Sequence, residues 1–320
     1  MKVVITDYQY DNVDAERRIV EDAGFELLDY QVKTPGALIP LVKDADAIIT
    51  QYADIDRQVI ESLEHCTMII KYGIGVNNID CRAAGEKGIY VCNVPDYGVH
   101  EVSDQAVTMI LCLGKKLEPL QEDLRRGKWG YGGIVPVKRF TECRAGLIGF
   151  GRIPQMVCRK LQAFGMEILV YDPFVDDAVI EASGASRASV EEICRNADFI
   201  SVHCPLTEET RHMIGEKEFA MMKPECCIVN TARGGVVDEQ ALIGALNEGR
   251  IAGAGVDVFE EEPVSVYHPL LHMENVIATP HSAWYSETAI TTLQRKAAEE
   301  VVNVLQGNEP FHCVNRQYLQ

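Results

Sequence analysis

Three charged side chains in the second half of the chain could together act on a small oxo acid. Arg233 follows an apolar run, Glu262 ends an acidic run, and His281 follows a proline. A guanidinium group can hold a carboxylate through two parallel hydrogen bonds. A histidine can give a proton, near neutral pH, to an oxygen that becomes negative, and a paired carboxylate keeps its imidazolium charged and oriented. These are the groups that reduction of a 2-oxo acid by hydride requires.

Each of these residues also has an ordinary explanation when it is taken alone. An arginine after a strand is commonly solvated or ion-paired, and a glutamate in an acidic run commonly lies at the surface. A single histidine among eight is usually structural. A nucleotide-binding pattern in the same half of the chain favours the chemical interpretation.

That pattern is the sequence Gly149-Phe150-Gly151, which follows a short apolar run and precedes a helical pattern. Asp172 follows Gly151 by 21 residues, at the end of the next apolar run. The first glycine permits a tight turn, the second lets the backbone approach a pyrophosphate, and the acid can bind a ribose. The alternative is that the glycines only mark a turn. Pro154 replaces the third glycine of the pattern, and a proline is tolerated in a first helical turn.

Short apolar runs alternate with helical patterns along the chain, which predicts parallel sheets covered by helices on both faces. The predicted strands are 3–5, 25–28, 47–50, 68–70, 90–91, 147–148, 168–171, 199–203, 227–230, 253–257 and 276–278. Long helices are expected at 13–22, 101–116 and 288–306. Several candidate residues lie at the C-terminal ends of these strands or just beyond them, where ligands bind to open sheets: Asp172, His203, residues 230 to 233, Asp257 and His281.

Composition limits the classes of partner. The 320 residues carry a formal net charge of −18, which disfavours nucleic acid as a direct partner. The chain has 11 scattered cysteines with no C-x-x-C pair, so no metal site is predicted and reduced thiols are expected. It begins with too short an apolar run for a signal peptide and has no run of the ~20 residues that span a membrane. We therefore expect a cytoplasmic protein that does not bind membranes.

Many ordered motifs resemble the D-2-hydroxyacid dehydrogenase family, and the resemblance covers nearly the whole chain. These motifs occupy residues 72–80, 92–95, 146–153, 171–173, 203–207, 230–238, 257–263 and 279–281. Residues 281–287 and 313–318 resemble the branch that contains the C-terminal-binding protein corepressors. The resemblance implies two α/β domains with doubly wound parallel sheets and an active-site cleft between them. It implies a discontinuous, flavodoxin-like substrate domain (1–99 plus 288–320), a Rossmann-type NAD-binding domain (100–287) and a homodimer.

The resemblance also assigns roles to individual residues. Arg233 would bind the substrate carboxylate and carbonyl, His281 would be the acid/base and Glu262 its partner. The implied NAD contacts are Gly149, Gly151, Arg152, Ile153, Asp172, His203, Cys204, Pro205, Thr210, Thr231, Ala232 and Asp257. The implied substrate contacts are Lys71, Ile74, Gly75 and Trp284.

This chain departs from the corepressor branch at two positions near the implied substrate. Lys71 stands where that branch has an arginine, which keeps the charge but loses the planar fork. Ile74 stands where it has a serine, which removes a hydroxyl group. Asp172 would repel a 2′-phosphate, and residues 173–177 contain no basic side chain, so we predict NAD rather than NADP.

Two functions stay open from the sequence. The first is an NAD-dependent enzyme that interconverts a 2-oxo acid and a D-2-hydroxy acid, and the second is an NAD(H)-sensing, corepressor-like scaffold on the same fold. For the enzyme, Trp284 predicts a pocket for an apolar or thioether side chain. The sequence shows no cluster of cations, which disfavours a phosphorylated substrate. The glycine-rich loop 127–133, with Trp129 and Tyr131, is either a subunit contact or an ordinary packed loop.

Overall fold

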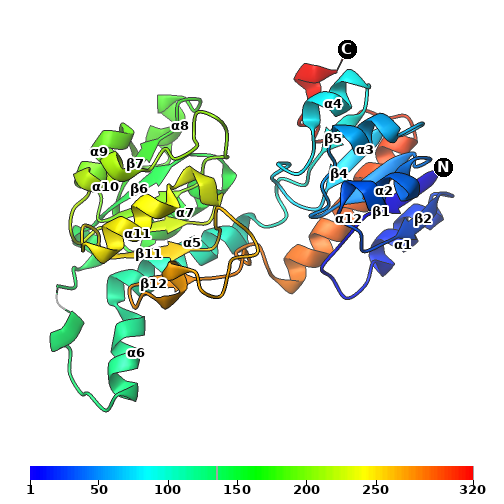
Figure 1. Cartoon of the computed structure of the whole chain (residues 1–320). Helices are drawn as coiled ribbons and strands as arrows, with labels where there is room; N and C mark the ends of the chain where they lie inside the picture. The colour runs from blue at the N-terminus through cyan, green and yellow to red at the C-terminus, as the bar shows by residue number, and fades with distance from the viewer. Residues whose placement is uncertain (135, 320) are drawn as a thin grey trace. The chain divides into compact units, whose positions relative to one another are not determined.

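The computed structural model describes residues 1–134 and 136–319, which form two compact units. Unit 1 comprises Met1–Gly98 and Ser286–Gln320, and unit 2 comprises Val99–Tyr285. Both units are parallel α/β sheets, as the alternating pattern predicts (Figure 1). The boundaries expected from the sequence, at 99/100 and 287/288, lie beside these divisions. No helix in residues 1–134 and 136–319 is long and apolar enough to cross a membrane.

Unit 1 is a five-stranded parallel sheet with the strand order β2-β1-β3-β4-β5. Its strands are β1 (Lys2–Ile5), β2 (Glu26–Asp29), β3 (Ala47–Thr50), β4 (Met68–Lys71) and β5 (Tyr90–Cys92). Its helices are α1 (Asp14–Asp22), α2 (Pro35–Val42), α3 (Arg57–Ser62), α4 (Cys81–Glu86) and α12 (Glu287–Leu305). The chain returns to this unit at its end, where α12 lies against α1 (Figure 1).

Successive side chains of each strand point to opposite faces of this sheet, so the apolar strands form an apolar layer on each face. Val3 and Ile5 pack with α12, which contributes Leu293 and Val301. Val4 points to the other face and packs with residues of α2 and α3. Because both faces are covered, the strands read as continuous apolar runs, which is why they could be found from the sequence.

Unit 2 is a seven-stranded parallel sheet with the strand order β12-β11-β10-β9-β6-β7-β8. Its strands are β6 (Arg144–Ile148), β7 (Glu167–Tyr171), β8 (Ser186–Arg187), β9 (Phe199–Val202), β10 (Cys227–Asn230), β11 (Gly253–Val256) and β12 (Val276–Ala278). Its helices are α5 (Val99–Lys115), α6 (Leu117–Arg125), α7 (Arg152–Ala163), α8 (Asp177–Ala182), α9 (Val190–Asn196), α10 (Glu216–Met221) and α11 (Glu239–Asn247). The order reverses between β6 and β9, and this switch point is where open α/β sheets bind ligands.

The two faces of this sheet are also buried. Leu147 and Val229 pack against α5 and α7, whereas Ile148 and Ile200 pack against α9 and α11. Helix α6 differs from the others because every one of its residues is at least partly exposed, and in Figure 1 it extends away from the sheet of unit 2.

Candidate active site

Six strands of unit 2 end at one edge of the sheet, since all of the strand pairs are parallel. The loops that leave this edge carry most of the residues singled out from the sequence: Gly149 after β6, Asp172 after β7, His203 after β9, Thr231 after β10, Asp257 after β11 and His281 after β12. The fold therefore brings together side chains that are more than 130 residues apart in the chain.

The glycine loop after β6 has the backbone that close approach requires. Gly149 has a φ of +96°, and a Cβ there would lie 3.0 Å from the backbone of His203 and Cys204. Gly151 is the N-cap of α7, and a Cβ on it would meet no described atom within 4 Å. The first turn of α7, which begins with Arg152 and Ile153, therefore offers backbone N–H groups beside open space.

Pro154 is buried in the first turn of α7. Its position there agrees with the tolerance of helix N-termini for proline. The substitution of the third glycine changes the packing of this helix without removing the turn that precedes it.

Asp172 connects the glycine loop to the end of β7. Its carboxylate accepts hydrogen bonds from the backbone N–H of Phe150 at 2.7 Å and of Phe174 at 2.8 Å. Arg187 on β8 donates to the backbone carbonyl of Asp172 at 2.6 Å and pairs with Asp177. Residues 173–177 contain no basic side chain, but the pairing of β7 with β8 brings Arg187, which lies outside that range, to this loop.

The residues after β9 hold their own loop. The ring of His203 shares a hydrogen bond with Ser201 Oγ at 2.9 Å, and burial lowers the pKa of His203 to about 3, so the ring is neutral at pH 7. Burial raises the pKa of the Cys204 thiol to about 11. Thr210 donates from Oγ1 to the carbonyl of Pro205 at 2.6 Å. These groups define the shape of the segment that the resemblance assigns to the cofactor.

Thr231 and Asp257 lie at the ends of β10 and β11. Thr231 Oγ1 is buried without a hydrogen-bond partner among the described residues. A bound ligand could supply the partner that a buried hydroxyl requires. The Asp257 carboxylate accepts from the Thr279 hydroxyl at 2.5 Å and from the Ser282 N–H at 2.9 Å. Asp257 thus fixes the loop that carries His281. The open space at Gly151 and the unsatisfied hydroxyl of Thr231 both fit a bound dinucleotide.

His281 and Glu262 form a short hydrogen-bonded pair in the site. The distance between His281 Nδ1 and Glu262 Oε2 is 2.7 Å, and Glu262 Oε1 accepts the N–H of Phe259 at 3.0 Å. Burial tends to raise the pKa of Glu262, but the hydrogen bond and charge of His281, the Phe259 N–H and the charge of Arg233 together lower it. The carboxylate is therefore ionised near neutral pH and orients the ring through Nδ1, so that Nε2 is the nitrogen able to transfer a proton.

Two further groups shape the surroundings of His281. Arg233 follows Thr231 and Ala232 and donates from Nη1 to the carbonyl of Ala232 at 2.6 Å. Trp284 donates from Nε1 to the backbone carbonyl of His281 at 2.9 Å. The tryptophan therefore supports the histidine loop, and its contact with a substrate stays a prediction.

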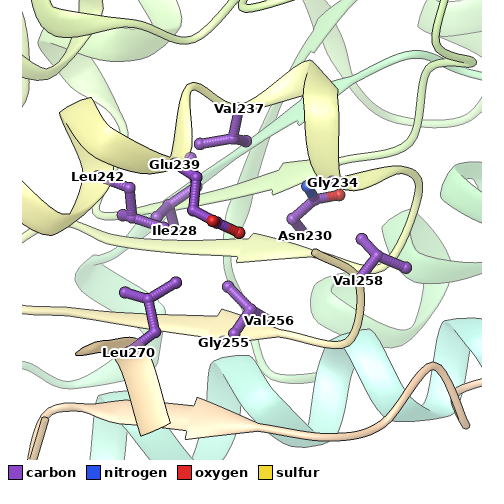
Figure 2. Close-up of a pocket in the computed structure, with 10 residues that line it drawn as sticks. All are labelled: Ile228, Asn230, Gly234, Val237, Glu239, Leu242, Gly255, Val256, Val258 and Leu270. Carbon is purple, nitrogen blue, oxygen red and sulfur yellow. The ribbon is translucent and has the colours of Figure 1, made fainter. Parts of the chain in front are cut away.

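A pocket lies behind the Arg233 loop, between β10, β11 and α11. Figure 2 shows Asn230 and Gly234 above the apolar side chains of Val256 and Leu270, with Glu239 reaching in from α11. Asn230 Oδ1 accepts the N–H of Ala232 at 3.0 Å, and its Nδ2 donates to the carbonyl of Arg233 at 2.9 Å. This region belongs to the packing that supports the Arg233 loop.

In unit 1, the implied substrate residues lie at the end of β4 and in the loop that follows. Lys71 is largely buried, and its Nζ donates to Asn78 Oδ1 at 2.9 Å and to the carbonyl of Gln51. Lys71 and Lys33 lie 5.3 and 5.2 Å from the centre of the Tyr52 ring. Two cations therefore lie against one aromatic ring.

The loop after Lys71 is also held by hydrogen bonds. Asn93 donates from Nδ2 to the carbonyl of Ile74 at 2.7 Å, and the N–H of Val94 donates to the carbonyl of Gly73 at 3.0 Å. The residues after β5 therefore hold the backbone at Gly73 and Ile74, just before Gly75.

Comparison with known proteins identifies the family. Residues 107–283 match the model of the D-isomer specific 2-hydroxyacid dehydrogenase NAD-binding domain. The chain belongs to the D-isomer specific 2-hydroxyacid dehydrogenase family. This result confirms the family expected from the motifs, the two-sheet fold class and NAD as the cofactor. The corepressor branch is not confirmed.

Three members of the family illustrate the similarity. The D-3-phosphoglycerate dehydrogenase of Methanocaldococcus jannaschii is 38% identical over 98% of this chain, which spans 59% of that relative's length. The glyoxylate reductase of Korarchaeum cryptofilum is 36% identical over 88% of this chain and 86% of its own. The D-lactate dehydrogenase of Aquifex aeolicus, solved with NAD and lactic acid, superposes with a TM-score of 0.88 at 27% identity, with 96% of each chain covered.

Proposed function

We propose that this protein is an NAD-dependent oxidoreductase that interconverts a 2-oxo acid and the corresponding D-2-hydroxy acid. The observation that carries the proposal is the 2.7 Å pair of His281 and Glu262, on the same sheet edge as the glycine loop. The names of the relatives, which are dehydrogenases and reductases, support this reading, and the scaffold alternative is not favoured.

Each of the three residues would have its own role in the reaction. Bound NADH supplies the hydride. His281 gives a proton from Nε2 to the carbonyl oxygen as it becomes negative, and Glu262 stabilises the charged imidazolium. Arg233 holds the carboxylate and orients the carbonyl group. In the reverse direction, His281 accepts the hydroxyl proton.

We further propose that Lys71 and the Ile74-Gly75 backbone of unit 1 receive part of the substrate. A basic side chain and backbone N–H groups are suitable partners for a carboxylate. Because Lys33 and Lys71 meet at Tyr52, a substrate with a second anionic group belongs among those to be tested, beside the apolar side chains that Trp284 favours. Lys71→Met should raise KM for the oxo acid about tenfold or more and leave the Kd for NADH unchanged.

The proposed function is tested by NADH oxidation with a panel of 2-oxo acids. The panel contains glyoxylate, pyruvate, hydroxypyruvate, 3-phosphohydroxypyruvate, and acids with branched, aromatic and methylthio side chains. Turnover with one class of oxo acid establishes the reaction. The order of kcat/KM among the oxo acids shows whether the substrate pocket favours apolar or anionic side chains. Failure to turn over any of them, with NADH bound, would instead support a cofactor-sensing protein.

NAD rather than NADP is expected because the Asp172 carboxylate would face the ribose hydroxyl groups and repel a 2′-phosphate. The measurement is kcat/KM with NADH and with NADPH on the same oxo acid. Comparable values would contradict the preference and point to Arg187, whose guanidinium lies beside Asp172, as a phosphate partner.

We propose a homodimer that uses the α6 region of unit 2. Trp129 and Tyr131 are 93% and 76% exposed, and Leu124 on α6 is also exposed. Exposed aromatic side chains of this kind are typical of subunit contacts. Light scattering should give twice the chain mass for the wild type, and Trp129→Ser with Tyr131→Ser should shift it toward the monomer. A monomeric wild type would refute this assignment.

A further inference from the structure

Two histidines of unit 2 share an uncommon backbone conformation and one acidic turn. Lys116, His212 and His281 are the non-glycine residues with positive φ among residues 1–134 and 136–319, and both histidines have a φ of +52°. His281 pairs with Glu262, and the ring of His212 shares a hydrogen bond through Nε2 with Glu260 Oε1 at 2.8 Å. The turn from Glu260 to Glu262 therefore lies between two histidines.

A left-handed backbone is unfavourable for a side chain with a Cβ, so it persists where the surroundings define it. The surroundings of His212 do so from two directions. Its N–H donates to the carbonyl of Gly235 at 2.9 Å, while its ring reaches Glu260. His212 thus links the segment after β9, the Arg233 loop and the turn that carries Glu262.

The turn is held against the Arg233 loop by further contacts. The N–H of Glu239 donates to Glu260 Oε1 at 3.1 Å, and the N–H of Glu260 donates to Glu239 Oε2 at 3.3 Å. A Cβ on Gly234 would lie 2.0 Å from the carbonyl group of Phe259, so the two backbones are in direct contact. A displacement of Glu260 would therefore move both Phe259, which donates to Glu262, and the neighbourhood of Arg233.

Each ring nitrogen of His212 faces a carboxylate. Glu260 lies at Nε2 of His212, and Asp238 Oδ2 lies 3.7 Å from its Nδ1. Glu239 is hydrogen-bonded to the backbone N–H of Glu260 and to the ring of His268. Without the ring of His212, the carboxylates of Glu260, Glu239 and Asp238 would lack one of the donors that hold them together. The turn would then be freer to move away from His281.

We propose that His212 is a positioning residue, whose pairing with Glu260 fixes the 260–262 turn and so holds Glu262 against His281. This inference rests on the proposed function for the roles of His281 and Glu262. The position is not evident from the sequence, because His212 lies in the loop after β9, 50 residues before Glu262.

The variant that tests the proposal is His212→Gly. Glycine accepts the positive φ without strain, so the change removes the ring and keeps the backbone. The matched control is His272→Gly, which removes a histidine of the same unit whose Nε2 contacts the backbone carbonyl of Val266. Thermal unfolding of each variant checks that it is folded, and Glu260→Gln provides a second variant with an almost unchanged side-chain volume.

Two measurements are made on each variant. The first is kcat and KM for the best oxo acid, with the Kd for NADH. The second is the ¹⁵N spectrum of the His281 ring across pH, assigned with His281→Asn, which reports the pairing with Glu262 whether or not a substrate is known. Glu262→Gln supplies the reference for a weakened pair.

We expect His212→Gly to lower kcat about tenfold, to leave KM and the NADH Kd within about twofold, and to shift the His281 ring signals toward those of Glu262→Gln. Addition of His212→Gly to Glu260→Gln should change kcat by less than about threefold, because the two residues act as one pair. An unchanged His281 spectrum in His212→Gly, or fully additive losses in the double variant, would overturn the proposal. A wild type that turns over no oxo acid defeats the proposed function, while the spectrum still tests the positioning.

Discussion

The first strand of each sheet is followed by a loop at the same topological position, and the two loops are used in opposite ways. In unit 1, β1 lies between β2 and β3, and Asp7 follows it. Its buried carboxylate accepts the N–H groups of Gln51 at 3.1 Å, Tyr52 at 2.7 Å and Ala53 at 3.1 Å. In unit 2, β6 lies between β7 and β9, and the residues that follow are Gly149, Phe150 and Gly151.

The difference shows how one topology yields either a structural connection or a ligand site. The switch point exposes backbone N–H groups that favour a negative charge. In unit 1 the chain supplies that charge itself, through Asp7. In unit 2 the glycines keep side chains away, and the carboxylate of Asp172 engages Phe150 while the space at Gly151 stays open. The match to an NAD-binding domain over residues 107–283 likewise lies within unit 2.

The largest effect is expected for the proposed acid/base, His281, on the same sheet edge as the glycine loop. His281→Asn should lower kcat about 10²–10⁴-fold, because the general acid is lost, and should leave the Kd for NADH nearly unchanged. Steady-state kinetics and NADH fluorescence titration measure the two quantities. Near-normal turnover by His281→Asn would exclude His281 as the acid/base.

The open space at Gly151 can be filled directly. Gly151→Ala should raise the Kd for NADH about tenfold or more, with little change in Tm, if the new methyl group enters the space that we propose for the pyrophosphate. Gly244→Ala, where a Cβ also meets no described atom within 4 Å, is the control and should bind NADH normally. Equal binding by both variants would mean that the cofactor does not approach Gly151.

Substitution of Asp7 in unit 1 should lower the stability of the protein and leave NADH binding unchanged, the reverse of what is expected for Gly151→Ala. Asp7→Asn replaces one acceptor oxygen by an NH2 group, so at least one of the three N–H groups loses its acceptor, and the change should lower the free energy of unfolding by about 1–3 kcal/mol. NADH binding should be unaffected. Urea unfolding and NADH titration provide the test, and a selective loss of NADH affinity would show that the two loops do not differ as described.

The smallest effect concerns His203, which lies on the same edge as the glycine loop. Its folded pKa, about 3, is below the unfolded value near 6.5. Above pH 6.5 the ring is neutral in both states and costs the folded protein no stability. As the pH falls from 6.5 toward 3, the unfolded chain binds a proton that the folded protein does not, and the free energy of unfolding decreases. At pH 5 the wild type should have lost about 1–2 kcal/mol that His203→Gln does not lose. The urea midpoints of both proteins at pH 7 and pH 5 provide the comparison. An equal decrease in stability in the wild type and in His203→Gln would show that His203 does not cause the pH dependence.

Much of the fold could be predicted because its signals are local. The buried parallel strands read as apolar runs, and the glycine loop with Asp172 forms a pattern of fixed spacing within one βαβ unit. The expectation that residues 288–320 return to the first domain came from the family resemblance, since α12 is distant in sequence from the sheet that it covers.

The contacts that complete the site depend on strand pairing and could not be predicted in this way. Arg187 reaches Asp172 because β8 pairs with β7, and Lys33 reaches Tyr52 across two loops of unit 1. His212 meets Glu260 only when the segments after β9 and β11 have folded against each other. Spacing along the chain carries no information about such pairs.

The proposed reaction is the reduction of a 2-oxo acid by NADH to the D-2-hydroxy acid. The most direct test incubates the wild-type protein with NADH and the preferred oxo acid of the panel, and separates the product by chiral chromatography. We predict one D-2-hydroxy acid formed for each NADH oxidised. The L-enantiomer, a racemic product, or NADH binding without any consumption would contradict the account.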